Sequence, residues 1–236
     1  LIKKSKNSDL KMVYYNRDGS AAEMCGNGIR CMAAFIYKMN LIRRKSLNIE
    51  TAAGEKSVSI DVENNKIKSI GVDMGTPGFR PEIIPVNIKG RSDIFNYRIE
   101  VEQNVFHINC VSLGNPHCVI FLDEGTDLKS YDVAKWGSKI ENLSIFPRKT
   151  NVEFVKIKNR RELDVRVWER GVGETMACGT GACAAGICTI KINKETGNEI
   201  TVNLPGGKLG IFWVPEESKV FLKGTVEHSF DGEYYL

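Results

Sequence analysis

Alternation of apolar and polar residues with a period of two dominates this chain, and it predicts a protein built mainly from β-strands. The alternation runs through residues 56–62, 66–73, 96–102, 105–113, 151–158, 162–169, 200–204 and 219–223. Helical spacing is rarer and predicts helices over residues 27–39, 131–141 and 180–193. In the first and last of these helices, apolar residues occupy most of the circumference, which is typical of a helix surrounded by protein.

This pattern predicts an α+β fold of two pseudo-symmetric lobes. In each lobe a curled, mainly antiparallel β-sheet or barrel is expected to surround one central helix. We expect the first lobe to comprise residues 1–80, joined by the tail 228–236, and the second lobe to comprise residues 81–227.

An internal repeat supports the expectation of two similar lobes. Five residues recur at a constant offset of 153 positions: Arg17 as Arg170, Cys25 as Cys178, Gly26 as Gly179, Gly28 as Gly181 and Gly54 as Gly207. A constant offset over this length indicates a duplication with one of these cysteines in each copy. Subtracting 153 from position 104, within the strands that precede the second cysteine, gives −49. We therefore expect the first copy to be shorter at its start by about fifty residues.

Composition excludes several classes of protein. Hydrophobic residues make up 42% of the chain, enough for a sizeable core, and the net charge of +4 is spread along it, so no nucleic-acid partner is expected. No apolar run is long enough to predict a membrane span, and the chain is expected to be cytoplasmic. The seven cysteines include no Cys-x-x-Cys pair, which favours reduced thiols over a disulfide framework.

The two repeated cysteines carry the candidate chemistry. Each begins a Cys-Gly-x-Gly sequence at the start of a predicted helix, where unpaired backbone N–H groups and the helix dipole stabilise a thiolate and bind a carboxylate. Such a position is expected to lower the thiol pKa from about 8.5. A single free Cys is usually a small buried hydrophobe, but two matched copies favour function for Cys25 and Cys178. The unrepeated cysteines are expected in the core: Cys31, Cys110, Cys118, Cys183 and Cys188.

Two thiols on opposite faces of one carbon can invert a stereocentre without a cofactor. A thiolate removes the proton from one face while the opposing thiol donates a proton to the other. Each placed acid or base typically contributes ~10²–10⁴ in rate. Backbone N–H donors aimed at the developing enolate add roughly 3 kcal/mol each.

Several motifs together resemble the diaminopimelate epimerase family. They are Asn-x-Asp-Gly-Ser at residues 16–20, Met-Cys-Gly-Asn-Gly-x-Arg-Cys at 24–31, Gly-Asn-Pro-His at 114–117, and Glu-Arg-Gly-x-Gly-Glu-Thr-x-Ala-Cys-Gly-Thr-Gly at 169–181. The resemblance implies interconversion of LL- and meso-diaminopimelate in lysine and peptidoglycan precursor synthesis, by two thiols, with no cofactor and no metal. It also implies a homodimer that binds this small molecule.

The resemblance implies roles for particular residues. Cys25 and Cys178 would be the acid and base, with His117 and Glu169 helping to set their ionisation. Backbone donors for the reacting carboxylate would come from Gly26, Asn27, Gly179 and Thr180. The substrate's distal groups would be bound by Asn16, Asn115, Asn151 and Arg170, with Glu169 also in contact with substrate. Taken one at a time, these residues also have ordinary structural explanations, as turn residues, a core imidazole or a member of a surface ion pair.

The chain departs from the family at two points. The family's N-terminal segment has no counterpart here, in agreement with the short first copy, and Phe230 stands where a Tyr is expected. Three alternatives follow from the residues: a proline or hydroxyproline racemase or dehydratase of the same fold, a zinc module using Cys25, Cys31, Cys178 and His117, and an inactive fragment that only binds an amino acid.

Overall fold

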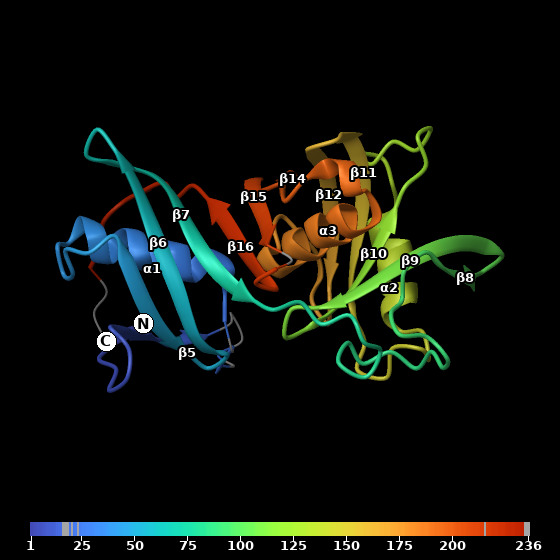
Figure 1. Cartoon of the computed structure of the whole chain (residues 1–236), viewed down its shortest axis with the longest axis horizontal. Helices are drawn as coiled ribbons and strands as arrows, with labels where there is room; N and C mark the ends of the chain where they lie inside the picture. Colours follow the sequence, from blue (N-terminus) through green and yellow to red (C-terminus); the bar gives the residue numbers. More distant parts are fainter. Residues whose placement is uncertain (16–18, 20, 23, 215, 234–236) are drawn as a thin grey trace. The chain divides into compact units, whose positions relative to one another are not determined.

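The computed structural model describes residues 1–15, 19, 21–22, 24–214 and 216–233. The chain forms two compact units. Unit 1 contains Leu1–Val72 and Gly224–Leu236, and unit 2 contains Asp73–Lys223. The described residues form mainly β-strands, together with three α-helices (Figure 1), which confirms the α+β class predicted from the alternation.

Unit 1 is a small sheet with one helix. Its sheet runs in the order β1 (Ile2–Lys3), β2 (Leu10–Met12), β5 (Ser46–Thr51), β6 (Gly54–Glu63) and β7 (Lys66–Gly75). The pairs are antiparallel except β2 with β5. A separate hairpin pairs β3 (Tyr14–Tyr15) with β4 (Ala21–Ala22). The helix α1 (Gly26–Lys38) lies against β6.

Unit 2 has a larger sheet and the other two α-helices. Its strands lie in the order β16 (Lys219–Gly224), β15 (Gly207–Val214), β14 (Glu199–Leu204), β12 (Glu162–Glu169), β11 (Asn151–Asn159), β10 (Pro116–Phe121), β9 (Asn104–Ser112) and β8 (Tyr97–Val101), and β13 (Gly173–Thr175) pairs with β12. The parallel pairs β10–β11 and β12–β14 interrupt a mainly antiparallel arrangement. The helices are α2 (Val133–Glu141) and α3 (Gly179–Ile192), followed by a 3₁₀ turn over Lys194–Thr196.

The sequence repeat is also a repeat of strand register. Adding 153 to the pairs of unit 1 gives pairs of unit 2: Ile2 with Met12 becomes Val155 with Val165, Leu10 with Ile49 becomes Leu163 with Val202, Tyr14 with Ala22 becomes Val167 with Thr175, and Thr51 with Gly54 becomes Leu204 with Gly207. The starts of α1 and α3, Gly26 and Gly179, differ by the same 153. Because one offset preserves the pairing, the strands of unit 1 around α1 and the strands β11–β16 around α3 share one topology.

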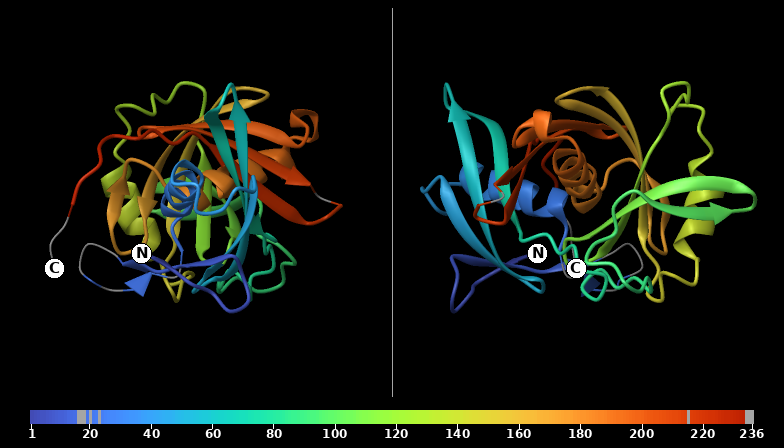
Figure 2. Two further views of the ribbon diagram at one scale, coloured as in Figure 1. Left: turned by 90° about the vertical axis from the view of Figure 1, so that its left-hand side faces the viewer. Right: turned by 45° about the vertical axis from the view of Figure 1, so that its right-hand side comes forward.

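The core of unit 2 surrounds α3, as its apolar circumference predicts. All ten residues from Gly181 to Ile190 are buried, and Figure 2 shows strands of this unit curving around the helix. Gly186 permits close packing of the helix on the sheet: a Cβ built there would lie 2.9 Å from Cγ2 of both Ile200 and Ile211. A side chain at position 186 would therefore force the two strands away from the helix.

The same prediction is wrong for α1. Phe35 is 48% exposed, and Cys31, expected in the core, is exposed as well. The buried apolar residues of α1 form one stripe with spacings of three and four: Ile29, Met32, Ala33 and Ile36. The described strands cover this stripe and leave the opposite face of the helix open. The other four unrepeated cysteines are buried as predicted.

Strand β11 separates two environments in unit 2. Val152 and Phe154 belong to a core that includes Ile108 and the α2 residue Ile140. Because side chains alternate along a strand, the neighbouring Asn151 and Glu153 lie on the opposite face, which contacts α3. Polar groups are therefore placed beside the N-terminus of α3.

Candidate functional site

The two repeated cysteines occupy the same structural position in their respective units. Cys25 is the N-cap of α1, with φ −132° and ψ 115°, and Cys178 is the N-cap of α3, with φ −127° and ψ 117°. Each sulfur accepts a hydrogen bond from the backbone N–H three residues later, at 3.3 Å from Gly28 and 3.4 Å from Gly181. Each thiol thus lies at the positive end of a helix.

The surroundings of Cys178 favour its protonated form. Its residue is 8% exposed. Burial, and next the negative charge of Glu169, raise the pKa of Cys178 to about 12, although the hydrogen bonds from Thr180 and Gly181 oppose this. The lowered pKa expected from the helix N-terminus is therefore wrong for this thiol, because desolvation of the thiolate outweighs the helix contribution.

A continuous chain of polar side chains leads to Cys178. Nε2 of His117 lies 3.0 Å from Oδ1 of Asn115, and Nδ2 of Asn115 donates to Oγ1 of Thr180 at 3.3 Å. Oγ1 of Thr180 lies 3.5 Å from Sγ of Cys178. The structure therefore brings four of the predicted site residues together, and His117 reaches the thiol through two intermediate side chains.

Glu153 is a member of this cluster that sequence reasoning missed. Its Oε1 lies 2.7 Å from Nδ1 of His117, and both side chains are 0% exposed. Oε1 also packs against Gly181, where a Cβ would lie 2.9 Å from it. Burial raises the pKa of Glu153, while the charge of His117 lowers it. The signal in the sequence was an ionisable residue within an apolar strand, between Val152 and Phe154.

Three further predicted residues lie at the ends of β11 and β12. Asn151 donates from Nδ2 to the carbonyl of Pro116 at 2.8 Å and accepts from the backbone N–H of Arg170 at 2.9 Å. The Arg170 side chain donates to the carbonyl of Arg148 at 3.2 Å. Glu169 accepts from Oγ1 of Thr175 at 2.5 Å. Asn151 therefore holds the backbone of Arg170 in place, next to Glu169.

Unit 1 carries the other predicted residues. Gly26 is the first residue of α1, and the exposed Asn27 accepts a hydrogen bond from the guanidinium of Arg30 at 2.9 Å. Arg30 also donates to the carbonyl of Gly26 at 3.2 Å. Asn16 lies outside the described residues. Among the residues that the structure does describe, no group of three His, Cys, Asp or Glu is arranged to hold a metal ion.

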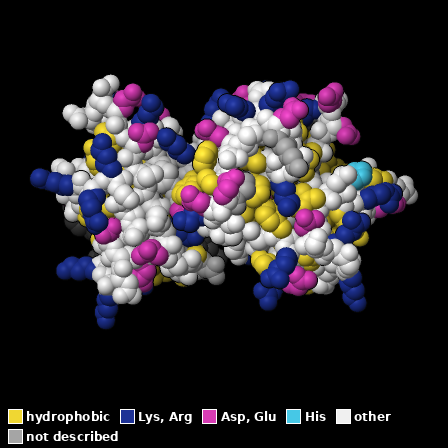
Figure 3. Space-filling view, viewed as in Figure 1, with side chains coloured by type: hydrophobic (Ala, Val, Ile, Leu, Met, Phe, Trp, Pro, Cys, Tyr) yellow, Lys and Arg dark blue, Asp and Glu magenta, His cyan; other side chains and the backbone are white. Residues whose placement is uncertain are grey.

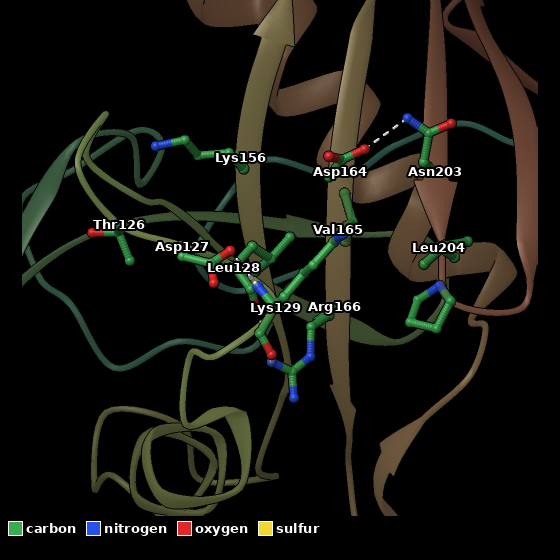
Figure 4. A pocket seen from close by; sticks show the side chains of 11 residues that line it. Thr126, Asp127, Leu128, Lys129, Lys156, Asp164, Val165, Arg166, Asn203 and Leu204 are labelled. Atoms are coloured by element: carbon green, nitrogen blue, oxygen red, sulfur yellow. Dashed lines mark hydrogen bonds between the residues drawn. The ribbon is translucent and has the colours of Figure 1, made fainter.

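A separate hollow of about 460 Å³ lies on unit 2, and its lining residues include none of the predicted site residues (Figure 4). It is formed by the loop 126–129, by β11 and β12, and by the end of β14. Its polar groups already have partners: Asn203 donates to Asp164 of the same hollow at 2.8 Å, and Lys156 donates to the carbonyl of Asp123, outside the hollow, at 2.6 Å.

The surface shows mixed charge. On the face seen in Figure 3, Lys and Arg side chains are interspersed with Asp and Glu side chains in both units. No helix of the described residues is long and apolar enough to span a bilayer.

Comparison with solved structures shows the class of fold. A PhzF-family phenazine biosynthesis protein of Bacillus anthracis aligns with 95% of this chain and 80% of its own, with a TM-score of 0.66 and 16% identity. A probable proline racemase of Agrobacterium radiobacter K84 aligns with 98% of this chain and 75% of its own, with a TM-score of 0.68 and 13% identity. At these identities the likeness establishes a shared fold alone, and it confirms the predicted fold class.

The sequence comparisons define the family. The diaminopimelate epimerase family profile matches residues 1–79 and 109–229. The diaminopimelate epimerase of Agathobacter rectalis is 44% identical over 235 residues, which cover 97% of this chain and 81% of that protein. The Halothermothrix orenii protein of the same name is 46% identical over 229 residues, which cover 97% and 78%. The chain belongs to the diaminopimelate epimerase family, as its motifs predicted.

Proposed function

We propose that this protein is an isomerase that interconverts LL- and meso-diaminopimelate. The observation that carries the proposal is the match to curated diaminopimelate epimerases at 40–46% identity across nearly the whole chain. The repeated Cys N-caps support it, because each supplies a thiol beside helix N–H groups that bind a carboxylate.

We propose a two-base mechanism in which each unit supplies one thiol. A thiolate removes the α-proton and becomes a thiol, and the other thiol donates its proton to the opposite face and becomes a thiolate. The bond electrons stay on the substrate as an enolate between the two steps, so no oxidant is needed. Because burial and Glu169 raise the pKa of Cys178, this thiol holds its proton at neutral pH in the free protein.

The remaining site residues receive roles by the same proposal. The backbone N–H groups at the helix starts bind the reacting carboxylate, which develops negative charge as the proton leaves. His117 and Glu169 act on the ionisation of Cys178. The groups proposed to bind the distal end of the substrate are Asn16, Asn115, Asn151, Glu169 and Arg170.

The decisive experiment follows LL-diaminopimelate in heavy water by NMR. We expect α-deuterium to enter the substrate together with formation of the meso isomer. Cys25→Ser and Cys178→Ser should each lower the rate of inversion by at least ~10². Cys31→Ser is the matched control, because this thiol is on α1 but exposed and unrepeated. It should retain activity.

Two outcomes would contradict the proposal. Exchange with proline or hydroxyproline and none with diaminopimelate would assign the chain to another reaction of this fold. Binding of diaminopimelate by calorimetry without any deuterium incorporation would make the chain a binding protein. We also propose a homodimer, a cytoplasmic location and a place in lysine and peptidoglycan precursor synthesis. These three proposals are kept only if the heavy-water assay is positive.

A further inference from the structure

The pair of Glu153 and His117 is buried inside unit 2, and its burial carries a cost in desolvation free energy. Both side chains are 0% exposed, and Oε2 of Glu153 has no hydrogen-bond partner among the residues that the structure describes. Removing a carboxylate from water costs several kcal/mol unless its charge and its lone pairs are well compensated. A well-packed apolar residue would fill this position at less cost. The arrangement therefore calls for a role beyond stability.

The strand register places this pair next to the first turn of α3, the helix that carries the thiol of Cys178. In the parallel pairing of β10 with β11, His117 lies opposite Asn151, two residues before Glu153, so the two side chains share one face of the sheet. That face contacts α3, and Oε1 of Glu153 packs against Gly181, whose N–H donates to Cys178. Glu153 thus touches the first turn of the helix that carries the thiol.

The available donors and acceptors give a direction to the series of hydrogen bonds that leads from His117 to Cys178. Oδ1 of Asn115 can only accept, so Nε2 of His117, 3.0 Å away, must carry a proton and donate it. Nδ2 of Asn115 then donates to Oγ1 of Thr180 at 3.3 Å. The Thr180 hydroxyl can then donate its own proton to Sγ of Cys178, which is 3.5 Å away.

Glu153 determines this direction through the other ring nitrogen. Because Nε2 already carries the proton that it donates to Asn115, Oε1 of Glu153, 2.7 Å from Nδ1, shares a second proton with the ring, either as carboxylate with imidazolium or as carboxylic acid with neutral imidazole. In both states Nε2 keeps its own proton. Without a partner at Nδ1, the ring is free to move its single proton or to turn. The hydrogen bonds from His117 to Cys178 would then lose their fixed donor-to-acceptor direction.

We propose that Glu153 is a positioning residue for Cys178: through His117, Asn115 and Thr180 it fixes a hydrogen bond from the Thr180 hydroxyl to the Cys178 sulfur. This inference rests on the proposed function only in naming Cys178 as a reacting thiol. The ionisable groups that interact with Glu153 come from the surrounding strands and helix: His117, Cys118, Glu169, Cys178 and Cys188.

Two substitutions at position 153 separate its hydrogen bond from its charge. Glu153→Gln removes the charge, but its amide can still donate to Nδ1 of His117. Glu153→Leu removes the charge and the hydrogen bond together, and it replaces a buried ion by an apolar group of similar size. Any difference between the two variants therefore reports the hydrogen bond alone.

The test is the alkylation rate of Cys178 by iodoacetamide, read by mass spectrometry of its peptide between pH 7 and pH 9. Below the thiol pKa this rate is proportional to the thiolate fraction, so a tenfold change in rate is one unit of pKa. We expect the Leu variant to react about tenfold more slowly than the Gln variant, because its thiolate lacks an ordered hydroxyl donor. Thr180→Val should abolish this difference, since it removes the last donor of the chain.

Equal rates for the Gln and Leu variants would overturn the proposal, and so would a difference that persists with Thr180→Val. If the Leu variant fails to fold, Thr180→Val alone decides, because it should slow the wild-type reaction about tenfold. Glu141→Gln is the matched control: this buried carboxylate of unit 2 binds Trp168 and Gly171 instead, and its variant should keep the wild-type rate. No substrate is used, so these results stand apart from the heavy-water assay of the proposed function.

Discussion

The raised pKa of Cys178 predicts a specific dependence of stability on pH. Burial and Glu169 raise this pKa to about 12, from about 8.5 for a free thiol. The folded protein therefore keeps a proton that the unfolded chain releases above pH ~9. The stabilisation is fully present below the unfolded pKa and is lost as the pH rises toward 12.

The magnitude follows from the number of protons involved. One proton retained only by the folded state lowers the free energy of unfolding by about 1.4 kcal/mol for each pH unit. Cys178→Ala removes this titration. Between pH 9 and pH 11 we therefore expect the free energy of unfolding of the variant to gain about 2 kcal/mol relative to wild type.

The assay is urea unfolding at several pH values under reducing conditions, followed by tryptophan fluorescence. All three tryptophans, Trp136, Trp168 and Trp213, belong to unit 2, so the signal reports the unit that contains Cys178. The other buried thiols with raised pKa values, Cys118 and Cys188, titrate in both proteins and cancel. A difference between variant and wild type that stays constant from pH 8 to pH 11 would refute the reasoning.

Two further predictions concern the packing of unit 2. Gly186→Ala should lower the free energy of unfolding by about 1 kcal/mol, because overpacking against Ile200 and Ile211 outweighs the gain in helix propensity; a stabilised variant in urea unfolding would contradict the tight packing. Glu141→Leu should cost about 2–4 kcal/mol in the same measurement, since the indole N–H of Trp168 and one backbone N–H lose their acceptor; an unchanged midpoint would show that these donors find other partners.

Much of the fold follows from local pattern. The predicted helix over residues 180–193 is α3, and the predicted strands over 162–169 and 200–204 are β12 and β14. These elements are readable because alternation and helical spacing report burial directly. The exposure of Cys31 was not readable in this way. Apolar residues around α1 indicate what a helix could bury, whereas the strands placed beside it decide which face is covered.

The candidate site was predictable where the residues repeat and less so where partners come from different strands. Cys25 and Cys178 stand out through a single offset and a shared helix-start motif. Glu153 was not singled out by the repeat, and its role depends on the parallel register that places it near His117. The pKa of Cys178 was mispredicted for a related reason, because the helix end is a local feature while desolvation depends on the whole surrounding sheet.

The division of the chain into units has a consequence for synthesis on the ribosome. Unit 2 is one continuous segment, Asp73–Lys223, whereas unit 1 combines Leu1–Val72 with the residues from Gly224 onward. Translation therefore delivers every residue of unit 2 before unit 1 has received its last segment. We expect the later half of the duplication to be the first to complete its folding, with the N-terminal half waiting for the end of the chain.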